Sequence, residues 1–369
     1  MEKQEYDFVV IGAGIAGLST AHHLSKDGHS VLVLEASDGT TSASFASTAE
    51  MNHDPDTHWE NVIETFGIEG AKQLWQVCAN GIDLLSEFAH QVGEEHFRTD
   101  RMPAYFYAYR DEDVGILQKR FDLYKRIGAH VSLETEDLPH PNFKGTLTIH
   151  GEGVTNNQQL LKTLVHTTRG QGGKIVYHQK VTSLGGGAVT TDTGDVYKGR
   201  KVIIATGDGG GLLPDSCEIE HKRTFVVSYE KEHLPEFFRS CVMWDTDEPY
   251  HYIRSFDNTR LWIGGEDIYE SSYTPSVALD EQKYANIADY AKGLFGLDDT
   301  YTRQAAWNAS FFSAKRGLPY IGEIAGTNHI ANVAFGGSGI ITSFLSGYLL
   351  AAWERDELLE YKKLFEINW

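Results

Sequence analysis

The sequence predicts an α/β protein in which a parallel-sheet domain is interleaved with a second α+β domain built on an antiparallel or mixed sheet. Short apolar runs that end in glycine occur near both ends of the chain and close to residue 200, as expected of strands buried on both faces. Residues 220–270 instead mix β-branched and aromatic residues with turn residues, which favours antiparallel strands. Glycine makes up 37 of 369 residues, above the usual ~7%, so the backbone has unusual conformational needs.

The first 35 residues have the pattern of a βαβ unit. An apolar run at 8–11 leads into Gly12-Ala-Gly-Ile-Ala-Gly17, apolar residues then recur at helical spacing, and a second apolar strand ends at Glu35. In this motif the glycines allow a tight turn, close approach of a pyrophosphate and helix–strand contact, and an acid about 20 residues further on binds a ribose. The unit therefore predicts a Rossmann-type dinucleotide site with the pyrophosphate at the helix N-terminus.

The remaining elements are predicted from hydrophobic periodicity and turn residues. An uncharged hydroxylic loop at 40–48 can either lie along a diphosphate or form a solvated connection. A pair of strands is predicted around 194–195 and a hairpin turn at 256–259. Helices are predicted at 58–92, 114–127, 154–169, 280–295 and 339–353, and strands at 104–109, 174–177, 181–184, 201–207, 224–229, 250–254, 261–264 and 332–335.

The order of these segments predicts two interleaved domains. Segments of the dinucleotide-binding type stand at the start, in the middle and at the end of the chain, separated by material of different character. We therefore assign residues 1–80, 150–220 and 310–369 to one discontinuous domain, and residues 81–149 and 221–309 to the other.

Charge and cysteine content exclude several function classes. The chain carries 52 acidic and 32 basic side chains and a formal net charge of −20, which disfavours nucleic acid and anionic membranes as partners. Three cysteines without a CxxC spacing favour a reducing compartment. We find no secretory signal and no apolar run of the roughly 20 residues that a membrane span needs. The sequence therefore predicts a cytoplasmic protein without a membrane span.

Four separated motifs together resemble the FAD-dependent amine and amino-acid oxidoreductases of the D-amino acid oxidase superfamily, which includes glycine oxidase, sarcosine oxidase and γ-glutamylputrescine oxidoreductase. They are the fingerprint at 12–17 with Glu35, Ile204-Ala-Thr-Gly207, Gly317-Leu-Pro-Tyr-Ile-Gly322 and Phe335-Gly-Gly-Ser-Gly-Ile340. The resemblance covers nearly the whole chain. It implies a bound FAD, a discontinuous flavin domain, and a mixed-sheet substrate domain over the reacting face of the flavin.

The resemblance also implies which residues contact FAD. The fingerprint holds the pyrophosphate and the adenosine ribose, the hydroxylic loop lies along the diphosphate, and Val181 offers backbone groups to adenine. The turn at 336–340 presents a helix N-terminus to the pyrimidine carbonyl of the flavin, where reduction places negative charge. The expected FAD contacts are Gly12, Gly14, Ile15, Ala16, Gly17, Glu35, Ala36, Ser42, Ala43, Ser44, Ala46, Ser47, Thr48, Val181, Ala205, Thr206, Gly207, Gly317, Gly336, Gly337, Ser338, Gly339 and Ile340.

Candidate substrate residues come mainly from the segment 248–254. Tyr250 and Arg254 resemble residues that glycine oxidase directs at its substrate, and Tyr252 is expected on the same strand face as Tyr250. Sheet packing is the alternative role for the tyrosines, and a structural ion pair is the alternative for Arg254. Lys315 is a further candidate because 314–319 is similar to the amine-oxidising branch of the family.

The segment 52–58 contains two histidines and two aspartates. Its spacing matches no zinc or EF-hand pattern, so we predict no metal site. We expect a loop near the flavin from which His53 can reach the active site.

Two departures from the family pattern narrow the chemistry. Phe311 or Phe312 stands where the amino-acid oxidases carry a carboxylate-binding arginine, so an amino-acid substrate is in doubt. Trp262 stands where sarcosine oxidases carry an oxygen-activating lysine, which points to an acceptor other than oxygen. The absence of a cysteine in 307–316 disfavours the sarcosine-oxidase type of covalent flavin.

The sequence therefore predicts a flavoenzyme that oxidises a C–N bond in a small amine or amino acid. A hydride would pass to flavin N5, and the resulting imine would be hydrolysed. The electron acceptor is oxygen or another acceptor. Two alternatives stay open: a dehydrogenase that passes electrons to a quinone or protein carrier, and a flavin-binding subunit without turnover. An NAD-dependent dehydrogenase is disfavoured because it has no use for the turn at 336–339.

Overall fold

The structure is a computed structural model and describes residues 5–365. The chain divides into two compact units, each built from separate segments. Unit 1 comprises residues 1–99, 155–220 and 311–369, and unit 2 comprises residues 100–154 and 221–310. The boundary expected at residue 80 falls inside α3 (Trp59–Val92), which is kinked at Gly67, and unit 1 continues to Thr99.

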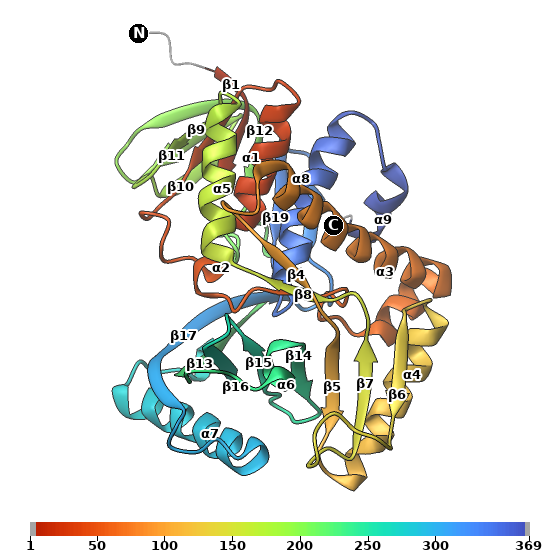
Figure 1. Ribbon diagram of the computed structural model, residues 1–369. Helices are drawn as coiled ribbons and strands as arrows, with labels where there is room; N and C mark the ends of the chain where they lie inside the picture. Colours follow the sequence, from red (N-terminus) through yellow and green to blue (C-terminus); the bar gives the residue numbers. More distant parts are fainter. Residues whose placement is uncertain (1–4, 366–369) are drawn as a thin grey trace. The chain divides into compact units, whose positions relative to one another are not determined.

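Unit 1 is built on a mixed sheet with a parallel centre (Figure 1). The strands follow the order β10–β11–β12–β1–β2–β9, and β19 pairs with β12 and with β18. The pairs of β1 with β12 and β2, of β2 with β9, and of β12 with β19 are parallel. The bounds are β1 (Glu5–Ile11), β2 (Val31–Leu34), β9 (Lys174–Val176), β10 (Val181–Gly185), β11 (Ala188–Thr191), β12 (Val196–Ile204), β18 (Tyr320–Glu323) and β19 (His329–Val333).

Four helices of unit 1 pack together beside this sheet. Helix α1 (Ile15–Lys26) contacts both α5 (Asn157–Gly170) and α8 (Gly339–Glu354), and α3 also packs on α8. The contact of α1 with α8 is close because Gly347 lies directly on the backbone of Ser19, where a larger side chain would overlap it. The short helices of unit 1 are α2 (Ala43–Ala46), α9 (Lys362–Phe365) and the 3-10 turn η3 (Leu359–Tyr361).

Unit 2 is built on a second mixed sheet with the order β17–β13–β16–β15–β14–β5–β7–β6. Its core lies between one face of the sheet and α7, where Phe225, Val227, Ile253 and Ile263 pack on Ile287. Helix α4 lies beside β6 and β7 (Figure 1). The bounds are β5 (Ala104–Ala108), β6 (Val131–Glu134), β7 (Gly145–Ile149), β13 (Ile219–Glu230), β14 (Val242–Asp245), β15 (Tyr252–Ser255), β16 (Arg260–Tyr269), β17 (Thr302–Ala314), α4 (Val114–Arg126), α6 (Glu236–Arg239), α7 (Val277–Phe295), η1 (Asp111–Asp113) and η2 (Glu270–Ser272).

Most predicted elements are present, with three corrections. Residues 196–204 form one strand, β12, where the sequence analysis separated two strands, because its polar first half pairs with β11 and its apolar second half pairs with β19. Residues 154–155 belong to the short strand β8 (Gly153–Thr155), and α5 begins only at Asn157. Strand β15 begins at Tyr252, so Tyr250 lies in the preceding turn. Two further short strands are β3 (Glu50–Met51) and β4 (Thr99–Arg101).

Between residues 5 and 365, the helices all fall short of the length and hydrophobicity that crossing a bilayer requires.

Two neighbouring histidines are buried where α1 packs against its neighbours. The His22 ring meets the edge of Phe88 in α3 at 5.1 Å between centroids, and the His23 ring meets Phe344 in α8 at 5.8 Å. Burial lowers the pKa of His22 from 6.5 to about 4 and holds the pKa of His23 well below 6.5. Both imidazoles are therefore neutral in the folded protein near pH 7.

This burial predicts a loss of stability at acid pH. Between pH 6.5 and about 4 the unfolded chain binds protons that the folded chain excludes from His22. The stability is therefore fully present above pH 6.5, and His22 alone removes about 2 kcal/mol of the unfolding free energy by pH 5. Urea denaturation at pH 7.5 and pH 5 measures this loss. His22→Gln will reduce the loss, whereas His90→Gln, at an exposed position in α3, will not; equal losses in all three proteins would refute the assignment.

Candidate functional site

The glycine-rich turn between β1 and α1 brings backbone against backbone. Gly12 has φ +104°, and a Cβ on it would lie 2.5 Å from the carbonyl oxygen of Ala205 at the end of β12. A Cβ on Gly17 would overlap the carbonyl of Gly12. Only glycine fits at both positions, and the turn leads directly into the first helical amides of α1.

The Glu35 carboxylate connects the end of β2 to this turn. Its Oε2 accepts a hydrogen bond from the Ala13 amide at 2.7 Å. Its Oε1 accepts from the Ser37 amide at 2.9 Å and from the Ser37 hydroxyl at 2.7 Å. The acid is therefore held rigidly beside the glycine turn, where it is able to accept ribose hydroxyls.

The hydroxylic loop reaches the N-terminus of α1. The Ile15 amide donates to Ser44 Oγ at 3.1 Å, and the Phe45 amide donates to Ser42 Oγ at 3.1 Å, so Ser42 caps α2. Asn157 fixes the position of this loop, because its Nδ2 donates hydrogen bonds to the carbonyls of Ser44 and Phe45 at 2.7 and 2.8 Å. Sequence analysis missed Asn157; its place as the first residue of a helix was the available signal.

A second glycine turn lies at the start of α8. Gly336 has φ +74°, and its amide donates to the carbonyl of Phe312 at 2.8 Å. The loop 52–58 joins this turn at two points. Asn52 Nδ2 donates to Ser338 Oγ at 3.2 Å, and the Gly337 amide donates to Asp56 Oδ2 at 3.2 Å. The loop with two histidines and two aspartates therefore braces the start of α8.

These features share one edge of the sheet in unit 1. Strands β2, β1, β12 and β19 are parallel neighbours in that order, and the chain leaves them at Glu35, Gly12, Gly207 and Gly336. The Ala334 amide donates to the Gly207 carbonyl at 2.9 Å, which connects the segment after β12 to the segment after β19. The carboxyl edge of a parallel sheet is where open α/β proteins bind their ligands.

The residues at this edge fit a polar ligand such as FAD. Asn52 Oδ1, Thr57 Oγ1 and Thr206 Oγ1 are buried and find no hydrogen-bond partner among residues 5–365. Buried polar atoms normally have partners, so these three indicate groups that a bound molecule would satisfy. The bare glycine turns at Gly12 and Gly336 supply the close backbone approach that a dinucleotide needs.

Comparison with protein families decides the identity of this fold. The model of the family described as "DAO: FAD dependent oxidoreductase" matches residues 7–353. The chain belongs to this family of FAD-dependent oxidoreductases. The resemblance seen in the sequence motifs is thereby confirmed, as are FAD as the cofactor and the mixed α/β fold with parallel and antiparallel strands.

Individual relatives are distant. The chain is 28% identical over 64% of its length to a Bacillus subtilis protein named "Putative Rieske 2Fe-2S iron-sulfur protein YhfW", and the match covers 47% of that relative. It is 24% identical to γ-glutamylputrescine oxidoreductase of Escherichia coli, over 94% of this chain and 82% of that protein. The crystal structure of glycine oxidase from Geobacillus kaustophilus superposes with a TM-score of 0.82 at 18% identity, covering 99% and 98% of the two chains. The chain thus spans about half the length of the first of these relatives.

The candidate substrate residues lie on the face of the unit 2 sheet opposite its α7 core. Arg254 pairs in register with Trp262, and its guanidinium lies 5.5 Å from the Trp262 ring centroid. Tyr252 pairs with Gly264, where any larger side chain would overlap the tyrosine ring, and the Tyr252 hydroxyl is 3.0 Å from Thr224 Oγ1. The Tyr250 and Tyr252 rings lie 6.1 Å apart. The structure therefore brings the Tyr250 and Tyr252 rings together and places Arg254 two residues further along β15, on the same face as Tyr252.

A buried acid and histidine anchor the turn that carries Tyr250. Asp245 accepts from the His251 amide at 2.9 Å and lies 3.0 Å from His251 Nδ1. The His251 ring stacks on Tyr290 of α7 at 3.7 Å between centroids. The Asp247 carboxylate accepts a hydrogen bond from Arg110 at 2.6 Å. Asp245, Asp247 and His251 form a cluster in which the side-chain atoms able to bind a metal ion lie within 4.8 Å of one another. Burial raises the pKa of the neighbouring Tyr290 hydroxyl well above 10. Sequence analysis missed this anchor because its members lie on both sides of the turn.

Other predicted residues stay predictions, with the following positions. His53 is buried in the loop 52–58, and its ring stacks on Trp75 at 5.4 Å. Lys315 is exposed and lies 3.4 Å from Glu218 Oε1. Gly317 approaches the loop 52–58, since a Cβ on it would be 2.9 Å from Thr57 Oγ1. Val181 is buried in β10 and pairs with Thr191.

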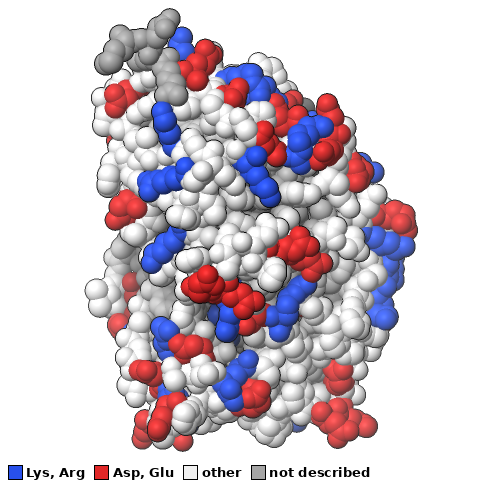
Figure 2. All heavy atoms as spheres, turned by 45° about the horizontal axis from the view of Figure 1, so that its top comes forward, with Lys and Arg blue, Asp and Glu red and all other residues white. Residues whose placement is uncertain are grey.

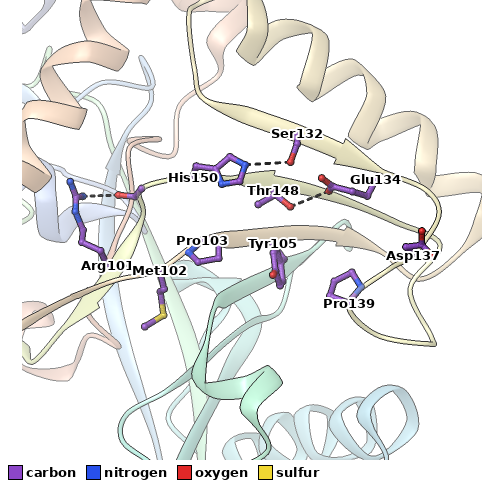
Figure 3. Close-up of a pocket in the computed structure, with 11 residues that line it drawn as sticks. Arg101, Met102, Pro103, Tyr105, Ser132, Glu134, Asp137, Pro139, Thr148 and His150 are labelled. Atoms are coloured by element: carbon purple, nitrogen blue, oxygen red, sulfur yellow. Dashed lines mark hydrogen bonds between the residues drawn. The ribbon is translucent and has the colours of Figure 1, made fainter.

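Unit 2 also carries a groove of about 550 Å³ that contains none of these candidates (Figure 3). It lies along β5, β6 and β7. Tyr105, Pro103 and Met102 line one side, and Thr148 donates to Glu134 Oε2 at 3.1 Å on the other. On the face that Figure 2 shows, acidic and basic side chains are interspersed. The net negative charge is therefore not gathered into one patch on that face.

The Glu35 geometry predicts its contribution to FAD affinity. Glu35→Gln removes the charge that accepts hydrogen bonds at the turn, and hydrogen bonds to charged groups contribute about 1.5–3 kcal/mol. We expect the dissociation constant of FAD, titrated into deflavinated protein, to rise at least tenfold. Asp38→Asn is the matched control, because this exposed acid accepts its hydrogen bonds from Thr40 within its own turn. Unchanged FAD affinity in Glu35→Gln would exclude a role for this acid in binding.

Proposed function

We propose that this FAD-dependent oxidoreductase oxidises a C–N bond in a small amine or amino acid. The observation that carries the proposal is the carboxyl edge of the unit 1 sheet, where two glycine turns, and three buried polar atoms without a hydrogen-bond partner among residues 5–365, suit FAD. Family membership supports the cofactor. The names of two relatives, γ-glutamylputrescine oxidoreductase and glycine oxidase, support an amine or amino-acid substrate.

The division of labour between the two units follows from their residues. Bound FAD supplies the two-electron acceptor, at N5 of its flavin ring. Unit 1 holds the cofactor through Gly12, Glu35, Ser44 and the start of α8. We expect Tyr252 and Arg254 of β15, with Tyr250 in the turn before it, to hold the substrate amine. Holding the reacting C–H bond in one orientation is the main contribution that such a site makes to rate.

The substrate class depends on what replaces the carboxylate-binding arginine of the amino-acid oxidases. Phe312 lies in β17, and a Cβ on Gly207 would be 2.9 Å from its ring, so an aromatic ring packs beside the strand-end glycine. An aromatic ring favours the uncharged part of an amine over a carboxylate. Arg254 is nevertheless buried on the substrate face and is able to bind a carboxylate.

Anaerobic reduction of the flavin tests the proposed function. We expect the yellow absorbance of the purified protein to bleach on mixing with at least one member of a panel of primary amines, secondary amines and small amino acids. A protein without bound FAD would refute the proposal. Bound FAD that no member of the panel reduces would leave the flavin-binding subunit without turnover as the correct interpretation.

The hairpin assignment predicts the effect of removing one hydroxyl. Tyr250→Phe keeps the ring that contacts Tyr252 and removes the polar group. With the best substrate of the panel, we expect the anaerobic rate of flavin reduction to fall at least tenfold. Tyr269→Phe is the control, because that tyrosine is 53% exposed at the end of β16. Equal reduction rates in Tyr250→Phe and the unaltered protein would remove Tyr250 from the site.

A second candidate function is a dehydrogenase that passes its electrons to a quinone or a protein carrier. By its resemblance to the sarcosine oxidases, the chain carries Trp262 where those enzymes carry an oxygen-activating lysine, and the Trp262 ring lies 4.5 Å from Phe256 and 5.4 Å from Trp307. A relative named as a Rieske iron–sulfur protein supports a protein acceptor. Both observations favour an acceptor other than oxygen.

The two functions differ in how the reduced flavin is reoxidised. For the dehydrogenase we expect reoxidation by air to be at least tenfold slower than by a water-soluble quinone, and Trp262→Lys to increase the rate in air. Stopped-flow absorbance after anaerobic reduction measures both rates. Peroxide formed in a one-to-one ratio with oxidised amine in air would show an oxidase instead.

A further inference from the structure

We propose that the Asp56 carboxylate at the start of α8 lowers the reduction potential of the bound flavin. The inference rests on the proposed function and adds a residue that sets how strongly the reduced cofactor donates its electrons. Asp56 is here a tuning residue that acts through charge.

Asp56 is fixed at the N-terminal end of α8 by several contacts. Its Oδ2 accepts the hydrogen bond of the Gly337 amide at 3.2 Å. Its own amide donates to Asp54 Oδ1 at 2.9 Å, and Asp54 in turn accepts from Trp59 Nε1 at 2.9 Å. Its backbone has φ +60°, a conformation that few residues other than glycine, asparagine and aspartate adopt. The turn therefore aims the carboxylate at the helix end.

A second side chain marks this helix end as a place for a ligand. Asn52 is 8% exposed, and its Nδ2 donates to Ser338 Oγ at 3.2 Å. Its Oδ1 is buried and has no hydrogen-bond partner in the described part of the chain. A polar atom in that state at the same turn indicates that a bound group completes the environment.

The strand order decides which half of the dinucleotide reaches α8. The residues that follow the parallel strands lie across the sheet in this order: Glu35 after β2, the Gly12 turn after β1, Gly207 after β12 and Gly336 after β19. With the adenosine ribose at Glu35 and the pyrophosphate at the Gly12 turn, the other half of FAD extends toward β12 and β19. The start of α8 therefore serves the flavin half.

The charges at this point oppose each other. Two-electron reduction places negative charge on the N1 and O2 side of the flavin, which the N-terminus of a helix stabilises with roughly half a unit positive charge. The exposed side chain of Asp56 brings a carboxylate to this helix end, where it occupies the amide of Gly337. The carboxylate offsets the helix dipole and destabilises the reduced, anionic cofactor. The reduced flavin becomes a stronger electron donor, as suits an enzyme that passes electrons onward.

The test compares the FAD-loaded protein with Asp56→Asn and Glu60→Gln. Asparagine keeps the hydrogen-bond acceptor and tolerates a positive φ, so only the charge is removed. Glu60, exposed in the first turn of α3 only four residues away, is the matched control for net charge. The two-electron midpoint potential is measured by dye-coupled reduction. We expect Asp56→Asn to favour the reduced form at least tenfold, a rise of about 30 mV, and Glu60→Gln to leave it unchanged.

A second measurement needs no turnover. Sulfite adds to oxidised flavin at N5 and leaves negative charge on the same N1 and O2 side, so the sulfite dissociation constant should fall at least tenfold in Asp56→Asn. Bound FAD with unchanged potential and unchanged sulfite affinity would overturn the role of Asp56 and leave the proposed function standing. Protein without FAD would overturn the proposed function itself. An equal shift of the midpoint potential in Glu60→Gln would show that the effect comes from the net charge of the protein, and it would also overturn the role of Asp56.

Discussion

Close approach of backbone to backbone at the end of β1 is the constraint on which the rest of unit 1 depends. Gly12 lies against the carbonyl of Ala205, and Gly17 lies against the carbonyl of Gly12. No Cβ fits at either place, so β1, β12 and α1 meet with their polar backbone groups turned to one edge. The Glu35 carboxylate then bonds to the Ala13 amide in the same turn. The same glycine turn therefore packs the strands against α1 and forms the backbone surface that suits a dinucleotide.

Close approach of backbone to backbone also occurs at α8. Gly347 allows α8 to lie directly on Ser19 of α1, and Ser19 Oγ donates to the Phe344 carbonyl at 2.6 Å. Close packing along the two helices aligns their N-termini at one edge of the sheet. Two helix dipoles would thus act on a bound FAD, one at its pyrophosphate and one at its flavin half. The loop 52–58 adds a carboxylate to the second of these ends, which gives the chain a means of adjusting the charge that it presents there.

In unit 2, by contrast, side-chain contacts rather than glycine turns position the candidate substrate residues. The face of its sheet that packs on α7 is apolar, and the opposite face carries Tyr252, Arg254 and Trp262. The turn before β15 is held by Asp245 and His251, which stacks on Tyr290 of α7. A buried hydrogen-bonded acid and a stacked ring make this turn rigid. The candidate substrate residues are thus supported from the core of their own unit.

Local patterns were sufficient to predict the dinucleotide motif, the helices α1, α4, α7 and α8, and the resemblance to a flavoprotein family, because glycine spacing and apolar periodicity are set over a few residues at a time. Tertiary structure alone decided what depends on distant segments meeting. It merged two expected strands into β12, because different neighbours pair with its two halves. It also placed Asn157 behind Ser44, His251 on Tyr290 and Asp56 on the Gly337 amide. These contacts join residues far apart in the chain or across a turn, and no periodicity in the sequence encodes which of many polar side chains reaches a given backbone group.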